Sequence, residues 1–158
     1  MTYQKHHISI LDPQEWYNLV AEEYKNYHTH LDSFYRFDVE RFIERDKKEF
    51  CILDIGAGDG RLYKHLSKLP YKEYVACDIA EKILAEHPGS VKKVICDLEE
   101  DLPFEDNHFD IITSFFVLEH IEHIQHLFQE ISRILAPKWK RIIGHFLQRR
   151  EFVWKKNK

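Results

Sequence analysis

Three of the five glycines in this chain of 158 residues lie within five positions, in the segment CILDIGAGDGRLYKHL (51–66). Gly56, Gly58 and Gly60 follow an apolar run and precede a segment compatible with a helix. A strand-to-helix turn without Cβ atoms lets a ligand approach the main-chain amides closely. The turn differs from the dinucleotide pattern G-x-G-x-x-G because Arg61 occupies the last glycine position, and it lacks a Lys-Ser or Lys-Thr pair. We expect a ligand without a pyrophosphate; a tight turn that binds nothing is the alternative.

Two aspartates follow the next two strand-like segments, YVACDI (74–79) and KKVICDL (92–98). Asp78 lies 24 residues after Asp54, close to the distance at which an acidic residue reaches a ribose in nucleotide-binding folds. Its carboxylate can accept both hydrogen bonds of a vicinal diol, and Asp97 can accept one from an exocyclic amine. Either aspartate could instead cap a helix. Together with the glycine turn, the two aspartates predict a cup for an adenosine-like ligand.

The elements that would position these residues alternate between strand and helix. Asp12 is a predicted N-cap, and Glu15 completes the spacing of a capping box. Single helices between consecutive strands imply right-handed crossovers, so we expect an α/β fold with a Rossmann-like, doubly wound parallel sheet. Ligands of such sheets bind beyond the carboxyl ends of the strands. We predict strands over residues 50–55, 74–79, 92–98, 110–116 and 141–147, and helices over residues 12–31, 37–44, 62–69, 80–87 and 119–135.

The composition is that of a globular domain, because 44% of the residues are hydrophobic and no apolar run reaches the roughly 18 residues of a membrane span. The first ten residues lack the layout of a signal peptide. We therefore expect a cytoplasmic protein without a membrane partner. The net charge of −4 hides a basic segment, since residues 138–158 contain eight basic residues and one acidic residue. Such a segment can bind nucleic acid or an acidic partner, although a solvated terminus is the more common case.

The cysteines and the clustered histidines do not predict a metal site. The spacing of Cys51, Cys77 and Cys96 matches no zinc pattern, and each lies in an apolar run, so we interpret them as small core residues. The spacing of three between consecutive residues of the set His120, His123 and His126 spreads the histidines around the polar side of a helix. We therefore expect no bound metal.

Taken in order, these motifs resemble the class I S-adenosylmethionine-dependent methyltransferases, in the small-molecule branch that includes ubiquinone- and menaquinone-type enzymes. The resemblance covers residues 17–143 and is carried by LDIGAGDG, VACDIAEKIL, CDLEEDLPFEDNHFDII and FFVLEHIEHIQHLFQEISRIL. It implies a sheet with strand order 3-2-1-4-5, S-adenosylmethionine as cofactor and S-adenosylhomocysteine as product. The cofactor-binding residues that it implies are Tyr24, Asp54, Gly56, Ala57, Gly58, Asp78, Ile79, Asp97, Leu98 and Phe115.

The resemblance also implies roles for some of these residues. Asp78 would bind the ribose, Asp97 would bind the adenine amine, and Tyr24 would cover the cofactor. The cofactor ammonium would donate to Asp54 or to a main-chain carbonyl near Phe115. His120, in the Leu-Glu-His segment after strand four, is the candidate catalytic base; the alternative is a polar residue that orders the first helical turn.

The sequence departs from the family pattern at its C-terminus. The chain stops shortly after strand five and so lacks the usual last two strands. We expect it to be a fragment of a longer protein; a naturally reduced protein is the alternative. An uncovered fifth strand would favour association, so a homodimer is one expectation. We predict a single methyltransferase-like domain over residues 1–158, with a helical cap over 1–48, the Rossmann-like core over 49–147 and a basic tail over 148–158.

The predicted function is the transfer of a methyl group from S-adenosylmethionine to a small-molecule acceptor. A module that binds the cofactor without catalysis is one alternative, because the missing strands often help to form the acceptor site. An RNA or protein methyltransferase that docks through its basic segment is another. A nicotinamide-dependent dehydrogenase is a distant fourth, because Arg61 replaces the required glycine.

Overall fold

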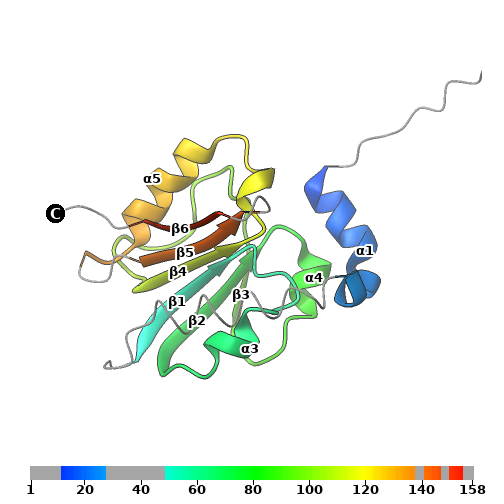
Figure 1. Cartoon of the computed structure of the whole chain (residues 1–158), viewed down its shortest axis with the longest axis horizontal. Coiled ribbons are helices and arrows are strands. Elements are labelled where there is room, and N and C mark those ends of the chain that lie inside the picture. Colours follow the sequence, from blue (N-terminus) through cyan, green and yellow to red (C-terminus); the bar gives the residue numbers. More distant parts are fainter. Residues whose placement is uncertain (1–11, 28–48, 138–140, 147–149, 155–158) are drawn as a thin grey trace, which may run out of the picture.

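The computed structural model describes residues 12–27, 49–137, 141–146 and 150–154 (Figure 1). Most of the predicted strands and helices are confirmed, but the predicted helix over 37–44 lies outside the described residues. The helices are α1 (Pro13–Tyr27), α3 (Tyr63–Leu66), α4 (Glu81–Ala85), the 3-10 turn η2 (Leu118–His120) and α5 (Ile124–Ile134). The strands are β1 (Phe50–Ile55), β2 (Tyr71–Asp78), β3 (Lys92–Ile95), β4 (Ile111–Phe115), β5 (Arg141–Phe146) and β6 (Arg150–Trp154).

The strands form one sheet in the order β3-β2-β1-β4-β5-β6, and β1 to β5 run parallel. The doubly wound α/β fold and the strand order 3-2-1-4-5 are therefore confirmed. The strand order reverses at β1, with β2 on one side and β4 on the other. The expected place for a ligand is therefore beyond the carboxyl end of β1.

The sixth strand corrects the prediction that the sheet ends at strand five. Strand β6 pairs antiparallel with β5, from Ile142 opposite Trp154 to Phe146 opposite Arg150. Its segment REFVW contains aromatic and β-branched residues, which have strong strand propensity. The basic residues around this segment favoured the prediction of a solvated tail. Because β6 covers β5, the exposed edge that suggested a homodimer is not at β5.

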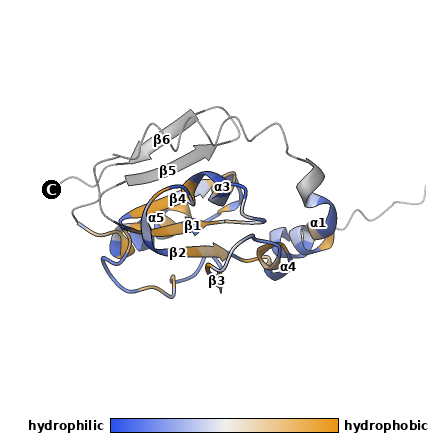
Figure 2. Cartoon of the chain, turned by 90° about the horizontal axis from the view of Figure 1, so that it is seen from below, coloured by the Kyte–Doolittle hydropathy of each residue, from blue (hydrophilic) through white to orange (hydrophobic). Residues whose placement is uncertain are grey.

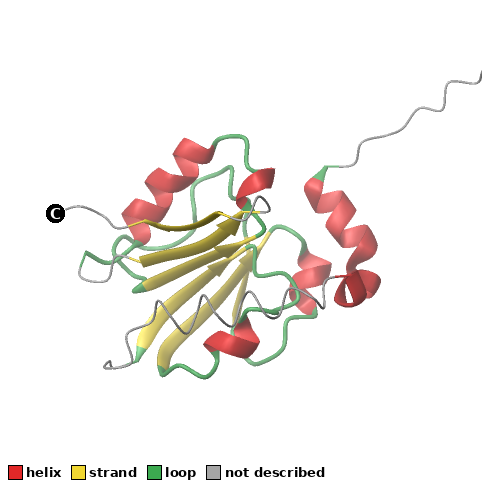
Figure 3. Cartoon of the chain, in the orientation of Figure 1, coloured by secondary structure: helices red, strands yellow, loops and turns green. Residues whose placement is uncertain are grey.

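Both faces of the sheet are covered, which explains why the strands read as continuous apolar runs. Helix α5 lies over one face and α3 over the other (Figure 3), and hydrophobic residues concentrate on β1, β2 and β4 (Figure 2). Alternate residues of a strand point to opposite faces. Leu53 and Ile55 therefore join the core beneath α5, whereas Phe50 and Ile52 join the core beneath α3.

The predicted helix over 119–135 is shorter in the structure, because α5 begins only at Ile124 and is preceded by the separate turn η2. The carboxylate of Glu99 accepts hydrogen bonds from the main-chain amides of Glu122 (2.5 Å) and His123 (2.9 Å). Glu99 therefore satisfies donors at the start of α5 from a distant segment. At the start of α1 the predicted cap is confirmed, since Asp12 accepts a hydrogen bond from the amide of Glu15 at 2.9 Å.

The cysteines lie where an apolar role requires, with one correction. Cys77 and Cys96 are buried in the core, as predicted, but they form a disulfide, which the sequence did not predict. Cys77 lies in β2 and Cys96 directly follows β3, the neighbouring strand. The two cysteines become neighbours only when these strands pair, so their spacing in the sequence does not predict the disulfide. Cys51 is a free, half-buried thiol. Among the described residues, no helix combines the length and the apolar character that crossing a bilayer requires.

Candidate active site

A cavity of about 590 Å³ lies at the carboxyl ends of β1, β2 and β4, and α1 forms part of its wall. Nine of the eleven residues predicted for the site line it, so the fold brings together groups that are up to 96 positions apart in the chain. These nine are Tyr24, Gly56, Gly58, Asp78, Ile79, Asp97, Leu98, Phe115 and His120. The other two, Asp54 and Ala57, are not among the lining residues.

The glycine turn after β1 needs its glycines for two different reasons. Gly56 and Gly58 both have positive φ values, +68° and +54°, which an L residue adopts only with strain. At Gly56 a Cβ atom would also overlap the side chain of Val117, whereas at Gly58 the nearest atom, in Ile83, would be 3.6 Å away. The turn can therefore pack against Val117, in the segment between β4 and η2, only because Gly56 has no side chain.

Asp78 is hydrogen bonded to the glycine turn and faces the cavity. Its Oδ2 accepts a hydrogen bond from the amide of Gly58 at 2.9 Å, and its Oδ1 accepts one from the amide of Ala80 at 2.8 Å. Burial raises the pKa of the Asp78 carboxyl group, while these main-chain donors act in the opposite direction. Each carboxylate oxygen has a second lone pair, so Asp78 can still accept hydrogen bonds from a ligand.

Asp54 is placed differently, although it also lies near the end of a strand. In the pairing of β1 with β2, Asp54 lies opposite Ala76, two residues before Asp78, so it is deeper in the sheet. Its carboxylate accepts hydrogen bonds from the hydroxyls of Thr113 (2.7 Å) and Tyr74 (2.8 Å). Burial raises the pKa of Asp54 to about 6 in spite of these two donors. The position of Asp54 makes it a structural residue beneath the cavity.

Ala57, the other residue outside the lining, is buried in the core beneath α3. Its amide donates a hydrogen bond to the carbonyl of Cys77 at 3.0 Å, which continues the pairing of β1 and β2 into the turn. Ala57 therefore supports the glycine turn from within the protein.

The side of the cavity next to β3 combines a carboxylate with an apolar surface. Oδ1 of Asp97 accepts a hydrogen bond from the amide of Glu99 at 2.9 Å, which leaves Oδ2 of Asp97 for a ligand. Leu98 is 6% exposed, and Ile79 and Phe115 also line the cavity. This part of the cavity can bind a flat ring that carries an amine.

Helix α1 closes the cavity and carries two tyrosines into it. The Tyr17 hydroxyl lies 3.2 Å from Nε2 of His120. Burial and the nearby carboxylates of Asp78 and Glu119 raise the pKa of Tyr17, so its hydroxyl keeps its proton and can donate to His120. Tyr24 is held by Arg61, whose guanidinium donates to the Tyr24 carbonyl at 2.7 Å and lies 5.0 Å from the centre of the Tyr24 ring.

Comparison with known proteins identifies the family. The family model described as a methyltransferase domain matches residues 53–140, more than half of the chain. The chain belongs to the class I S-adenosylmethionine-dependent methyltransferases. The match includes the turn after β1, the ends of β2 and β4, and α5, so it contains most of the cavity of this methyltransferase.

Relatives with described sequences and structures agree with this assignment. An uncharacterised protein of Methanocaldococcus jannaschii, MJ1123, is 33% identical over 137 residues, which cover 85% of this chain and 62% of that protein. The ubiquinone/menaquinone biosynthesis C-methyltransferase UbiE of Pseudomonas fluorescens is 34% identical over 106 residues, covering 60% of this chain and 41% of the relative. An S-adenosylmethionine-dependent methyltransferase from Mesorhizobium loti shares the fold, with a TM-score of 0.61 at 22% identity over 72% of this chain and 54% of that one. The chain thus spans about half the length of the curated relatives that it matches.

Some residues around the cavity of the methyltransferase were not predicted from the sequence. Gln14 donates from its side chain to the carbonyl of Ile79 at 3.1 Å, and Glu99 lines the cavity while it caps α5. The partners of Gln14 and Glu99 are 65 and 23 residues away along the chain. Local patterns such as capping boxes relate residues within one turn, so they could not indicate these contacts.

Proposed function

We propose that this methyltransferase binds S-adenosylmethionine in the cavity at the carboxyl ends of the strands and transfers its methyl group to a small-molecule acceptor. The observation that carries the proposal is the hydrogen bond between Gly58 and Asp78, because it joins the turn to a carboxylate that lines the same cavity as Asp97. A turn without side chains at Gly56 and Gly58, a diol acceptor and an amine acceptor together suit an adenosine with an amino-acid tail.

Each end of the cofactor has matching residues in the cavity. Asp78 would accept from the ribose hydroxyls, Oδ2 of Asp97 would accept from the adenine amine, and Leu98 would pack on the base. The methionine part would lie against the main chain of the glycine turn, where Gly56 and Gly58 line the cavity. Since Asp54 is buried beneath the cavity, the ammonium would instead donate to a main-chain carbonyl near Phe115.

His120 and Tyr17 are placed to act on the acceptor. The bound cofactor would supply a methyl group that is attacked in line, and such a reaction depends chiefly on the positioning of the two partners. Nε2 of His120 would take a proton from an acceptor hydroxyl that replaces the Tyr17 hydroxyl at 3.2 Å. Tyr17 would then hold the acceptor or the imidazole in its orientation.

Cofactor binding can be tested by isothermal titration with S-adenosylmethionine and S-adenosylhomocysteine. We expect Asp78→Ala to weaken both by about 10- to 150-fold, since a hydrogen bond to a charged group contributes roughly 1.5–3 kcal/mol. The control is Asp101→Asn, which removes a carboxylate that is 89% exposed and is not among the cavity residues. A wild-type protein that binds neither compound, while its circular dichroism shows a folded chain, would overturn the proposal.

Turnover separates an enzyme from a binding module. We expect release of S-adenosylhomocysteine when the protein is incubated with the cofactor and a panel of phenols, quinols and small amines. His120→Asn should lower kcat by about 100-fold or more while the Kd of the cofactor stays the same, because general-base catalysis contributes that much. Cofactor binding without turnover on any acceptor would favour the non-catalytic module instead.

The acceptor, the cellular location and nucleic-acid binding complete the proposal. The small-molecule acceptor is supported by the position of α1, which closes the cavity over its carboxylates. A cytoplasmic location, and the division into a helical cap over 1–48 and a core over 49–147, stay predictions. RNA binding through residues 138–158 would appear as an affinity that falls steeply with salt.

A further inference from the structure

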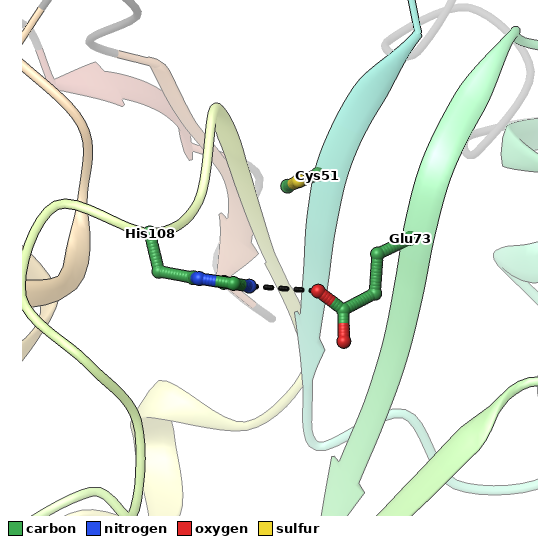
Figure 4. Close-up of side chains that lie close together, drawn as sticks. All are labelled: Cys51, Glu73 and His108. Carbon is green, nitrogen blue, oxygen red and sulfur yellow. Dashed lines mark hydrogen bonds and ion pairs between the residues drawn. The ribbon is translucent and has the colours of Figure 1, made fainter.

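A second group of reactive side chains lies at the opposite end of the sheet from the cavity. Cys51 is the second residue of β1, Glu73 is the third residue of β2, and the two lie opposite each other in the pairing of the strands. His108 belongs to the connection that precedes β4. Figure 4 shows the three side chains pointing toward one another from these three segments.

Each of the three residues offers one atom that metals bind. The thiol sulfur of Cys51, a carboxylate oxygen of Glu73 and a ring nitrogen of His108 all lie within 4.8 Å of one another. Nε2 of His108 is 2.7 Å from Oε2 of Glu73. In a tetrahedral zinc site with bonds of about 2.0–2.3 Å, the ligand atoms are roughly 3.3–3.8 Å apart. Side-chain rotations that move these atoms by about 1 Å would bring them to the separations of a zinc site.

Two carboxylates and two lysines surround the cluster, and the lysines leave the face of Glu73 toward His108 open. Glu73 and Asp110 both lie near the Cys51 thiol, and Oδ2 of Asp110 accepts a hydrogen bond from the Cys51 amide at 2.9 Å. Two lysines lie in the same region. Lys72 interacts electrostatically with the Cys51 thiol, and Nζ of Lys92 is 3.9 Å from Oε1 of Glu73. Lys92 therefore approaches the other carboxylate oxygen, and Oε2 of Glu73 faces His108. All three ligand residues are half-buried, so an ion there would exchange some but not all of its water.

We propose that Cys51, Glu73 and His108 bind a divalent transition-metal ion of the zinc class, with water as the fourth ligand. A thiolate combined with an imidazole favours Zn²⁺ over Mg²⁺ or Ca²⁺, which prefer sites made of oxygen atoms. The ion would join the starts of β1 and β2 to the connection before β4. Its role would be to stabilise the fold, because a ligand that binds only the folded chain adds its binding energy to the stability.

This site is independent of the proposed methyl transfer. Cys51 and Glu73 lie at the starts of strands whose far ends carry Gly56 and Asp78, and none of the three ligands is a cavity residue. The chain spacing of 22 and 35 residues matches no zinc motif, which is why the sequence predicted no metal.

The test is a titration of the full chain with Co²⁺ and with Zn²⁺, in the presence of a phosphine reductant. We expect wild-type protein with Co²⁺ to show the near-ultraviolet charge-transfer band of a cobalt–thiolate bond, and Cys51→Ser to lose it. His108→Gln and Glu73→Gln should weaken Zn²⁺ by at least about tenfold each, since even outer residues of metal sites cost 10–100-fold. Zn²⁺ should raise the Tm of the wild type, and a chelator should reverse the rise.

The controls address the other thiols and histidines of the chain. His126→Gln removes an imidazole paired with Asp101 at 3.4 Å, and Cys96→Ser removes one of the two sulfur atoms of the disulfide; both variants should bind Zn²⁺ like the wild type. If Cys51→Ser fails to fold, His108→Gln with an unchanged circular dichroism spectrum decides the question. The proposal is wrong if wild-type protein shows no thiolate band, or if His108→Gln binds Zn²⁺ as tightly as the wild type.

Discussion

The two ends of the sheet present reactive residues in different ways. At the carboxyl end, Gly56 and Gly58 lie in the turn after β1 and Asp78 is the last residue of β2, and the hydrogen bond from the Gly58 amide to Asp78 joins them beside the cavity. At the amino end, Cys51 and Glu73 lie within the first three residues of β1 and β2, and the register of the two strands places them opposite each other. The carboxyl end is therefore encoded in short contiguous motifs, whereas the amino end depends on how distant segments align.

The largest effect that would test this contrast is expected at Gly56. Gly56→Ala forces a left-handed residue and an overlap with Val117, so we expect it to lower the free energy of unfolding by about 2–5 kcal/mol. The Cβ of Gly58→Ala would be in ordinary van der Waals contact with Ile83, at 3.6 Å, so this variant should cost only about 1–2 kcal/mol from its positive φ. Urea unfolding measures both values.

A double variant separates the two causes at Gly56. Adding Val117→Ala to Gly56→Ala removes the overlap but not the strain, so part of the lost stability should return. Equal losses in Gly56→Ala and Gly58→Ala would show that packing against β4 does not distinguish the two glycines.

The sequence predicted the carboxyl end of the sheet better than any other part of the molecule. The glycine turn, Asp78 and Asp97 line one cavity because neighbouring parallel strands end at the same edge, a rule that needs no coordinates. The register of β1 and β2 places Asp54 two residues deeper than Asp78, and this register cannot be read from one strand.

Contacts between distant segments account for the other differences. The cap that Glu99 supplies to α5 and the pairing of Cys77 with Cys96 both join segments that only the fold brings together. Strand β6 is hard to predict for another reason: its aromatic and β-branched residues, which favour a strand, lie among basic residues, which are typical of a solvated terminus.

The next prediction tests whether Asp54 belongs to the cavity or to the interior. The unfolded chain releases the Asp54 proton near pH 4 and the folded chain near pH 6, so the folded state binds this proton more tightly. Its contribution to the free energy of unfolding should therefore fall by about 3 kcal/mol as the pH rises from about 4 to above 6. Asp54→Asn should remove this pH dependence without changing the affinity for the cofactor.

Urea unfolding of wild type and Asp54→Asn between about pH 4.5 and pH 7 measures the effect as a difference between two curves. Parallel curves would contradict a raised pKa at Asp54. A cofactor affinity lowered as much as in Asp78→Ala would place Asp54 in the site after all.

The smallest effect is expected at the amino end of the sheet. Arg133 of α5 donates to the carbonyls of Leu102 (2.9 Å) and Phe104 (2.7 Å), and pairs with Asp106 and Glu130, which anchors the connection that leads to His108. Arg133→Lys keeps the charge but cannot reach these acceptors together, so we expect a loss of about 1–2 kcal/mol in the free energy of unfolding.

The same variant should leave the affinity for S-adenosylmethionine unchanged, because Arg133 is not a cavity residue. Titration calorimetry with the wild type as reference checks this. A cofactor affinity that falls together with stability would mean that the two ends of the sheet are energetically coupled and not independent.

The contact between Arg61 and Tyr24 has a consequence for the lifetime of any complex. Arg61 occupies the chain position next to the glycine turn, and its guanidinium holds the main chain of α1 above the cavity. A molecule bound in the cavity would contact both α1 and the glycine turn, and movement of α1 away from the turn would break the bond from Arg61. The Arg61 side chain therefore affects how long a bound molecule stays in the cavity. Substitutions at Arg61 should change the dissociation rate of such a complex more than its association rate.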